Sequence, residues 1–355
     1  MGYYVGLDVS QQQTAICIVN DAGERIKEGK ANTNPLAIAI WITGQINPKE
    51  IAHVGLEAGA MAAWLYAGLI KLDFPMVCLE TFQTHQFLKS HRNKTDKNDA
   101  RGLAQLLRMG QDYFKTVIIR SEEHQAIRLL LNAREHLVTQ KIGLENNITG
   151  CLKPFGVLVR RGHVSAKSFR SRMLPTLQEL EARNITIQNY VLPLLDAHDS
   201  VCTQLKDLTQ QAHQLAKENP ICRRLMTAPG VGPIVALSYM TAVDQPERFR
   251  SGEDVGAYFG LTVKQYQSGE TDVRGPISKR GNHMTRRHLV QAATTLLIGR
   301  KWSVIKAWGM KISKRSGFCK ARVAVARKLS IILHRMWVNE ENFRWTSAEE
   351  TILAA

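Results

Sequence analysis

Short apolar stretches separated by polar turns predict strands in the first quarter of the chain. Residues 3–9 ("YYVGLDV") are rich in aromatic and β-branched side chains, and residues 14–20 ("TAICIVN") repeat this character after a polar gap. Such compositions are typical of strands. The turn-forming residues 21–23 ("DAG") then precede "ERIKEGKA", and this order indicates strand, turn and strand.

Two further strands and a helix are predicted from the residues that follow. Residues 51–56 ("IAHVGL") and 75–80 ("PMVCLE") have strand composition. Residues 58–72 ("AGAMAAWLYAGLIKL"), which lie between them, have the composition and length of a helix. Strands that open as hairpins and then alternate with helices indicate a mixed α/β layer, with acidic residues at strand ends.

The pattern becomes helical from Ser121 onward. Ser121 precedes two glutamates, which is typical of a helix start, and apolar residues recur at helical spacing as far as Ile148. After a basic, glycine-containing break at 153–172, a heptad seam extends over about three repeats. The seam is formed by Val191, Leu194, His198, Val201, Leu205, Leu208, Ala212 and Leu215. It predicts helix packing, either within one chain or between chains.

A compact basic domain is predicted after Pro220. A Gly-x-Gly turn precedes an alanine-rich helix; such a turn either lets the backbone approach a phosphate or simply connects two helices. Residues 261–270 ("LTVKQYQSGE") predict a strand that runs into a loop, and residues 283–298 and 320–337 predict helices with one basic and one apolar face. The predicted domains are 1–120, a helical connector at 121–220, a basic domain at 221–340 and a tail at 341–355.

The positive charge of the chain is concentrated in its last third. The formal net charge is +16, and residues 261–338 contain 17 lysines and arginines but only Glu270 and Asp272 as acids. This imbalance favours nucleic acid as the partner over an anionic membrane surface. No apolar run is long enough to span a bilayer and no signal peptide is recognisable, so we expect a cytoplasmic protein. The scattered cysteines lack zinc-ligand spacing and are expected to be reduced, mostly buried thiols.

Four acidic residues lie where the predicted fold can bring them together. Asp8 follows the apolar part of the first strand, Glu57 ends the third, and Asp96 and Asp99 share one helix face because they are three residues apart. Clustered carboxylates repel one another, and Mg²⁺ or Mn²⁺ relieves this repulsion. Two such ions about 4 Å apart can clamp the attacking and leaving oxygens of a phosphoryl transfer. Each acid on its own is equally consistent with a helix cap, a turn or a salt bridge.

Basic residues flank the last two acids and can hold a phosphate backbone against the negatively charged site. These residues are Arg92, Lys94, Lys97 and Arg101.

Several blocks of the sequence carry a specific resemblance. "GLDVS", "GLEAG" and "NKTDKNDAR" resemble the Asp, Glu, Asp, Asp motif of the Piv/MooV invertases and their insertion-sequence transposase relatives, a family of bridge-RNA-guided DNA recombinases. "APGVGPIVALSYM", "FRSGEDVGAYFGLTVKQYQSGE" and "ISKRGN" are similar to the C-terminal transposase domain of that family. The blocks extend in order over most of the chain.

The resemblance implies a fold, a chemistry and partners. The fold is a RuvC-type, RNase H-like mixed sheet domain, followed by a coiled-coil connector and a mostly helical transposase domain. The metal ligands are Asp8, Glu57, Asp96 and Asp99. The nucleophile is Ser268, which attacks a DNA phosphodiester to give a covalent protein–DNA intermediate. Donor and target DNA, a non-coding bridge RNA and further copies of the chain, as a dimer to tetramer, are the implied partners.

Residues around the serine suit contact with phosphates. Gly269 permits close approach of the backbone to a phosphate. Ser278 is the closest alternative to Ser268 as the nucleophile, but its place just before a helix suits a capping role. The residues predicted to contact nucleic acid in this domain are Gly230, Gly232, Lys264, Arg274, Lys279, Arg280, Arg286 and Arg287. Three alternatives remain: a hydrolytic junction resolvase, a DNA invertase that needs no guide RNA, and a nucleic-acid-binding scaffold without catalysis.

Overall fold

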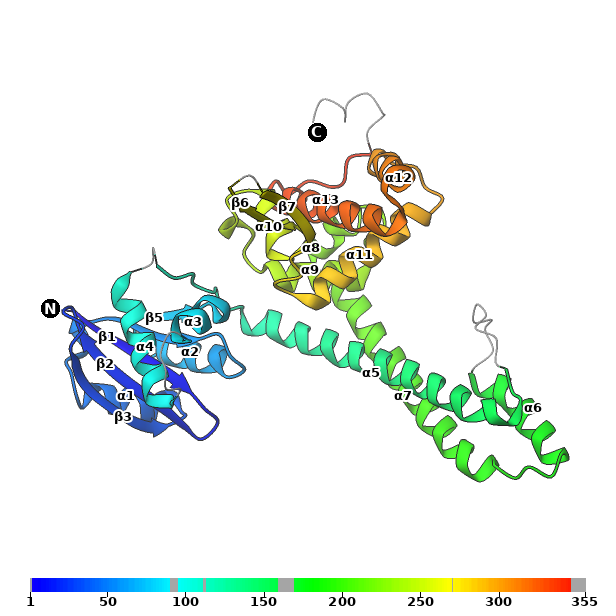
Figure 1. Ribbon diagram of the computed structural model, residues 1–355, viewed down its shortest axis with the longest axis horizontal. Helices are drawn as coiled ribbons and strands as arrows, with labels where there is room; N and C mark the ends of the chain where they lie inside the picture. Colours follow the sequence, from blue (N-terminus) through cyan, green and yellow to red (C-terminus); the bar gives the residue numbers. More distant parts are fainter. Residues whose placement is uncertain (1, 90–94, 111–112, 159–168, 270, 346–355) are drawn as a thin grey trace. The chain divides into compact units, whose positions relative to one another are not determined.

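The computed structural model describes residues 2–89, 95–110, 113–158, 169–269 and 271–345. The chain divides into two compact units, Met1–Arg120 and Ser121–Ala355 (Figure 1). The boundary predicted at residue 220 lies inside the second unit, between two helices. Half of the predicted basic break at 153–172 and most of the predicted tail fall outside the described residues.

A mixed five-stranded sheet forms the centre of the first unit. Its strands are β1 (Tyr3–Val9), β2 (Gln13–Asn20), β3 (Arg25–Asn32), β4 (Ile51–Glu57) and β5 (Met76–Leu79). The spatial order is β3-β2-β1-β4-β5. β1 pairs antiparallel with β2 and parallel with β4, β2 pairs antiparallel with β3, and β4 pairs parallel with β5. The predicted mixed α/β layer and its four apolar strands are therefore confirmed.

Helices cover both faces of this sheet. They are α1 (Pro35–Thr43), α2 (Ala62–Ile70), α3 (Thr81–Leu88) and α4 (Asp96–Met109). On one face, Val5, Leu7 and Leu56 pack in a buried core with residues of α1 and α2. On the other face, Ala15 and Cys17 of β2 pack against α4, which lies across β1 and β2 (Figure 1). α1 was not predicted from the sequence, because its residues are apolar on nearly every side and no helical period is visible.

Three long helices open the second unit: α5 (Glu122–Leu152), α6 (Phe169–Ala182) and α7 (Gln188–Glu218). Ser121 caps α5 by accepting a hydrogen bond from the His124 backbone, as the sequence predicted. α5 and α7 pack against each other within one chain (Figure 1). The predicted packing within one chain is therefore present, and pairing between chains stays a prediction.

The buried positions of α7 differ from the predicted seam by one residue at two places. Leu195 and Ala216 are fully buried, whereas the predicted Leu194 is half-buried and Leu215 is 36% exposed. Ala216 belongs to the core that α7 shares with α9. A strict seven-residue repeat cannot predict this one-residue shift of the buried positions, because α7 contacts α5 along its length and α9 only near its end.

The rest of the second unit surrounds a single apolar core. Its elements are α8 (Pro220–Leu225), α9 (Pro233–Val243), α10 (Gly252–Tyr258), β6 (Val263–Ser268), β7 (Thr271–Ile277), α11 (His283–Ile298), α12 (Val304–Ser316) and α13 (Phe318–Val338). The core includes Tyr239, Phe259 and Leu329, together with Ile127 of α5. α11 and α13 were predicted, whereas β7 and α12 were not. No helix among the described residues is long and apolar enough to cross a membrane.

The cysteines differ sharply in burial, and this leads to a chemical prediction. Cys17, Cys78 and Cys222 are buried, and burial raises the pKa of each to about 12, whereas Cys151 and Cys319 are exposed. The thiolate is the reactive form, so a raised pKa slows alkylation at pH 8. We expect iodoacetamide to modify Cys151 and Cys319 first, as followed by mass spectrometry. Equally rapid native modification of Cys222 would contradict this burial.

Candidate active site

Two paired glycines allow α4 to lie close to the sheet. Gly6 of β1 is the register partner of Gly55 of β4. A Cβ atom on Gly6 would overlap the carbonyl oxygen of Ala100, and one on Gly55 would come within 2.6 Å of a methyl group of Leu107. Any larger residue at Gly6 would therefore push the α4 backbone away from the strands.

The alternation of side chains along each strand places two acids on the sheet face that α4 covers. Side chains two residues apart lie on the same side of a strand, so Asp8 shares the face of Gly6, and Glu57 shares the face of Gly55. Leu7 pairs with Leu56, so Asp8 and Glu57 are the next residues along two neighbouring parallel strands. The backbones of neighbouring strands are about 4.8 Å apart. Both lie at the carboxyl ends of their strands.

The first turn of α4 lies at this edge of the sheet. Asp8 pairs with Ala15, and Ala15 pairs with Lys30 in β3, so the three residues form one row across the sheet. The Lys30 Nζ atom donates to Asp96 Oδ2 at 3.1 Å. At the other end of α4, the Arg108 guanidinium donates to the backbone of the turn between β2 and β3. α4 is therefore antiparallel to β1.

The start of α4 is fixed by a cap that also sets the position of its acids. The side chain of Thr95 accepts a hydrogen bond from the Asn98 backbone, and the Asp99 backbone donates to the Thr95 carbonyl. Asp99 directly precedes Ala100, whose carbonyl faces Gly6. Asp96 and Asp99 are thus held in the helical turn nearest to the strand-end acids.

The side chains at this edge suit a divalent metal ion by chemistry and by backbone placement. All four candidate ligands are carboxylates, the hard oxygen donors that Mg²⁺ and Mn²⁺ prefer. Within the described residues, no three His, Cys, Asp or Glu side chains are grouped tightly enough to hold an ion. The Asp96 carboxylate contacts Lys30, and both are exposed. An exposed pair of this kind is worth at most about 1 kcal/mol, so it is a weak competitor for a metal.

The candidate nucleophile lies in the second unit, at the tip of the β6–β7 hairpin. Ser268 ends β6 and pairs with Thr271 at the start of β7, and Gly269 has a positive φ of 57°. A positive φ is typical of tight hairpin turns. Ser268 is exposed, and no described residue is hydrogen-bonded to its hydroxyl oxygen.

Comparison with known proteins connects both sites to one family. Residues 222–308 match the family described as "Transposase IS116/IS110/IS902 family", and residues 5–156 match the DEDD transposase domain of the IS110 group. The first match includes Ser268, and the second includes all four acids. The chain belongs to the DEDD transposases of this family.

Individual relatives agree with this assignment. The transposase is 28% identical over 350 residues to the transposase for insertion sequence element IS1111A of Coxiella burnetii, a match that covers 96% of this chain and 91% of the relative. It is also 28% identical over 240 residues to the transposase for insertion sequence element IS1328 of Yersinia enterocolitica, with 68% and 69% covered. The protein is thus an enzyme of DNA transposition, and its DEDD domain implies a divalent metal ion.

The candidate nucleic-acid contacts of the transposase fall into two groups. In the first unit, Lys97 and Arg101 are exposed on α4. In the second unit, the exposed residues are Lys264 and Arg274 on the β6–β7 hairpin and Lys279 and Arg280 just after it. Arg92 and Lys94 lie outside the described residues.

Arg286 was predicted to bind nucleic acid, and the structure corrects this. Its side chain is only 7% exposed, and its guanidinium donates to the carbonyls of Phe259 and Arg280 at 3.0 Å. Burial also lowers the pKa of Arg286. Its neighbour Arg287 is exposed but forms an ion pair with Glu135 of α5. Arg286 therefore fastens the loop before α11 in place.

Ser278 does not cap α11, contrary to the expectation from sequence. Asn282 is the N-cap residue, and its side chain accepts a hydrogen bond from the Thr285 backbone. The backbone of Ser278 instead donates to the carbonyl of Thr262.

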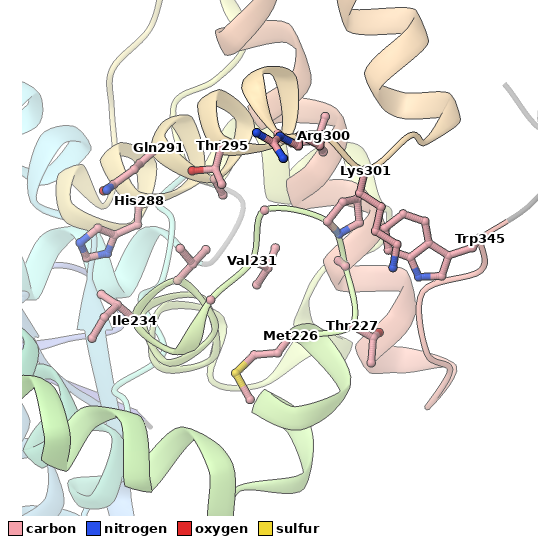
Figure 2. Close-up of a pocket in the computed structure, with 18 of the residues that line it drawn as sticks. Met226, Thr227, Val231, Ile234, His288, Gln291, Thr295, Arg300, Lys301 and Trp345 are labelled. Carbon is pink, nitrogen blue, oxygen red and sulfur yellow. The ribbon is translucent and has the colours of Figure 1, made fainter. Parts of the chain in front are cut away.

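The Gly-x-Gly turn borders a groove of about 740 Å³ (Figure 2). Gly230 has a φ of 80°, and a Cβ atom there would overlap the Ala292 carbonyl of α11, so packing accounts for this glycine. Gly232, the N-cap residue of α9, has open space beside it. At one end of the groove the Lys301 ammonium lies 3.7 Å from the centre of the Trp345 ring. The predicted phosphate approach remains a prediction for Gly232.

The close approach of α4 leads to a stability prediction. We expect Gly6→Ala to destabilise the first unit by about 3 kcal/mol, because the new methyl group meets backbone rather than a movable side chain. Gly59→Ala is the matched control, since the nearest atom to its Cβ would lie at 3.9 Å. Urea unfolding, followed by loss of Cys17 protection, measures both. Equal stability of the two variants would contradict the tight packing of α4.

Proposed function

We propose that this transposase cleaves and rejoins DNA strands through Ser268, with Mg²⁺ held by Asp8, Glu57, Asp99 and Asp96. Mn²⁺ is expected to substitute. The observation that carries the proposal is the register of β1 and β4 beneath α4, because it brings acids from three separate segments to one sheet edge. The strand order and directions also agree with an RNase H-like fold, which we propose for the first unit.

The residues of the chain suit the following steps. The Ser268 hydroxyl gives up its proton as its oxygen forms a bond to phosphorus, while the bond from phosphorus to a deoxyribose oxygen breaks and that leaving oxygen takes up a proton. The bound metal supplies Lewis-acid stabilisation of the charge on the phosphoryl oxygens. Lys264 and Arg274 lie on the same hairpin as Ser268 and can neutralise the scissile phosphate. The serine–phosphate link conserves the energy of the phosphodiester, so rejoining needs no nucleotide cofactor.

The proposal also includes the oligomeric assembly of the protein and the selection of its DNA target by an RNA. The acids and the serine belong to different units, and we propose that they meet within a dimer or tetramer of the chain in the cytoplasm. We further propose that a non-coding bridge RNA selects the DNA target by base pairing, while the protein contacts backbone and shape. The excess of basic residues in the second unit supports a nucleic-acid partner but does not distinguish RNA from DNA.

The form of the cleaved ends tests the chemistry. The full-length protein, Mg²⁺ and labelled DNA that carries the ends of the element are incubated and stopped with detergent. We expect labelled DNA that migrates with protein until a protease is added. Free ends without protein would favour the second candidate, a resolvase that uses the same acids for hydrolysis.

The nucleic acid that copurifies with the protein tests whether an RNA guides the choice of DNA target. Sequencing is expected to find one discrete non-coding transcript. Strand exchange by protein that has been freed of RNA would instead favour an invertase or transposase without a guide.

A further inference from the structure

Helix α12 and the start of α13 carry several basic residues and no acidic ones. The sequence contains no Asp or Glu between Asp272 and Glu340. Lys311, Lys314 and Arg315 are exposed on α12. Among the residues that the structure describes, no lysine or arginine of α12 or α13 forms an ion pair with a carboxylate. Uncompensated positive charge of this kind attracts a polyanion.

Aromatic side chains lie exposed within this surface. Trp308 is 41% exposed and Phe318 is 39% exposed. Trp308, Lys311 and Arg315 follow one another at three- and four-residue spacing, so they share one face of α12. At the adjoining end of α13 the Arg322 guanidinium lies over the Phe318 ring, 5.5 Å from its centre.

The buried core of the second unit does not include these aromatic rings. The adjoining stripe of α12 is the buried one: Ile305 and Gly309 are buried, and a Cβ atom on Gly309 would lie 2.6 Å from a methyl group of Val325. Close packing at Gly309 therefore attaches α12 to α13 without the help of Trp308. An exposed tryptophan that shares a helix face with Lys311 and Arg315 is available for a ligand that has both flat apolar faces and negative charge.

We propose that α12 and the start of α13 bind an unpaired DNA strand, with bases stacked on Trp308 and Phe318 and phosphates neutralised by Lys311, Lys314 and Arg315. Bases in an intact duplex stack on one another and leave no face for a tryptophan, whereas unpaired bases stack on aromatic side chains. DNA is the substrate of a transposase, and its strands must separate before they are exchanged. The proposal does not depend on the Ser268 chemistry.

Binding of matched oligonucleotides tests the surface. The full-length protein is titrated with a labelled single strand of about 20 nucleotides and with its duplex. We expect Trp308→Ala to weaken single-strand binding about tenfold and duplex binding less than about twofold. Trp308→Phe keeps a ring and is expected to recover most of the affinity. Trp64→Ala is the matched control, because Trp64 is 50% exposed on α2 of the first unit.

Salt dependence tests the role of the cations. Lys311→Gln together with Arg315→Gln is expected to reduce the slope of log affinity against log salt by about 1.4 for the single strand. Binding is measured without a divalent metal ion, so strand cleavage does not contribute to the result, which separates this proposal from the catalytic one.

Three results would overturn the proposal. The first is that Trp308→Ala behaves like Trp64→Ala. The second is an equal loss of duplex and single-strand binding. The third is that an RNA of the same sequence binds at least about tenfold more tightly than the DNA strand, which would assign the surface to RNA.

Discussion

Ser268→Ala is expected to reduce the covalent attachment of the transposase to DNA by at least about a thousandfold, because no other group can replace a lost nucleophile. The side chain is exposed at a hairpin tip and supports no core, so stability and DNA binding should stay close to those of the wild type. The measurement is the fraction of labelled DNA that remains linked to protein on a denaturing gel.

Ser278→Ala is the matched control for this experiment. Ser278 lies ten positions further along the same basic region, and its backbone, not its hydroxyl, bonds to Thr262. We expect this variant to keep wild-type attachment. If Ser268→Ala still attaches to DNA, or Ser278→Ala alone abolishes attachment, the assignment of the nucleophile is wrong.

Asp8→Asn and Glu57→Gln are each expected to reduce strand cleavage by at least about a hundredfold. Each substitution keeps the size of the side chain but removes a negatively charged ligand for a cation. Both residues lie at strand ends and are only partly buried, so the fold should persist. Cleavage rates at increasing Mg²⁺ and Mn²⁺ concentrations measure the effect.

Glu50→Gln is the control for general loss of charge in the same unit. Glu50 is exposed before β4, away from the carboxyl ends of the strands. Its removal should leave cleavage within about twofold of the wild type, as is usual for surface substitutions. Full activity of Asp8→Asn would contradict a catalytic role for the acidic edge.

The sequence contained a strong signal for the acidic edge but not for its geometry. "GLD" and "GLE" each place a glycine, a core leucine and an acid in the same order on two strands. That Gly6 and Gly55 face each other in register, and that α4 fills the space above them, depends on contacts between distant segments. Local pattern cannot predict such pairing, and it also gave no sign that Lys30 would contact Asp96.

Other differences have local physical causes. β7 contains Gly275 and Pro276, which are unfavourable inside strands but tolerated in a two-stranded hairpin. α12 carries many cations, and its start was marked only by Ser303, which caps it. Arg286 was grouped with the basic face of α11, although the buried Leu289 three residues later indicated the apolar face.

The most direct test of the account is the position of the metal ion in a transposase–DNA complex that is competent for strand cleavage. Crystals grown with Mn²⁺ allow the ion to be located by anomalous diffraction. We expect Mn²⁺ about 2 Å from carboxylate oxygens of Asp8, Glu57 and Asp99, next to a DNA phosphate. Mn²⁺ bound at another part of the protein, with these three carboxylates away from both metal and DNA, would contradict it.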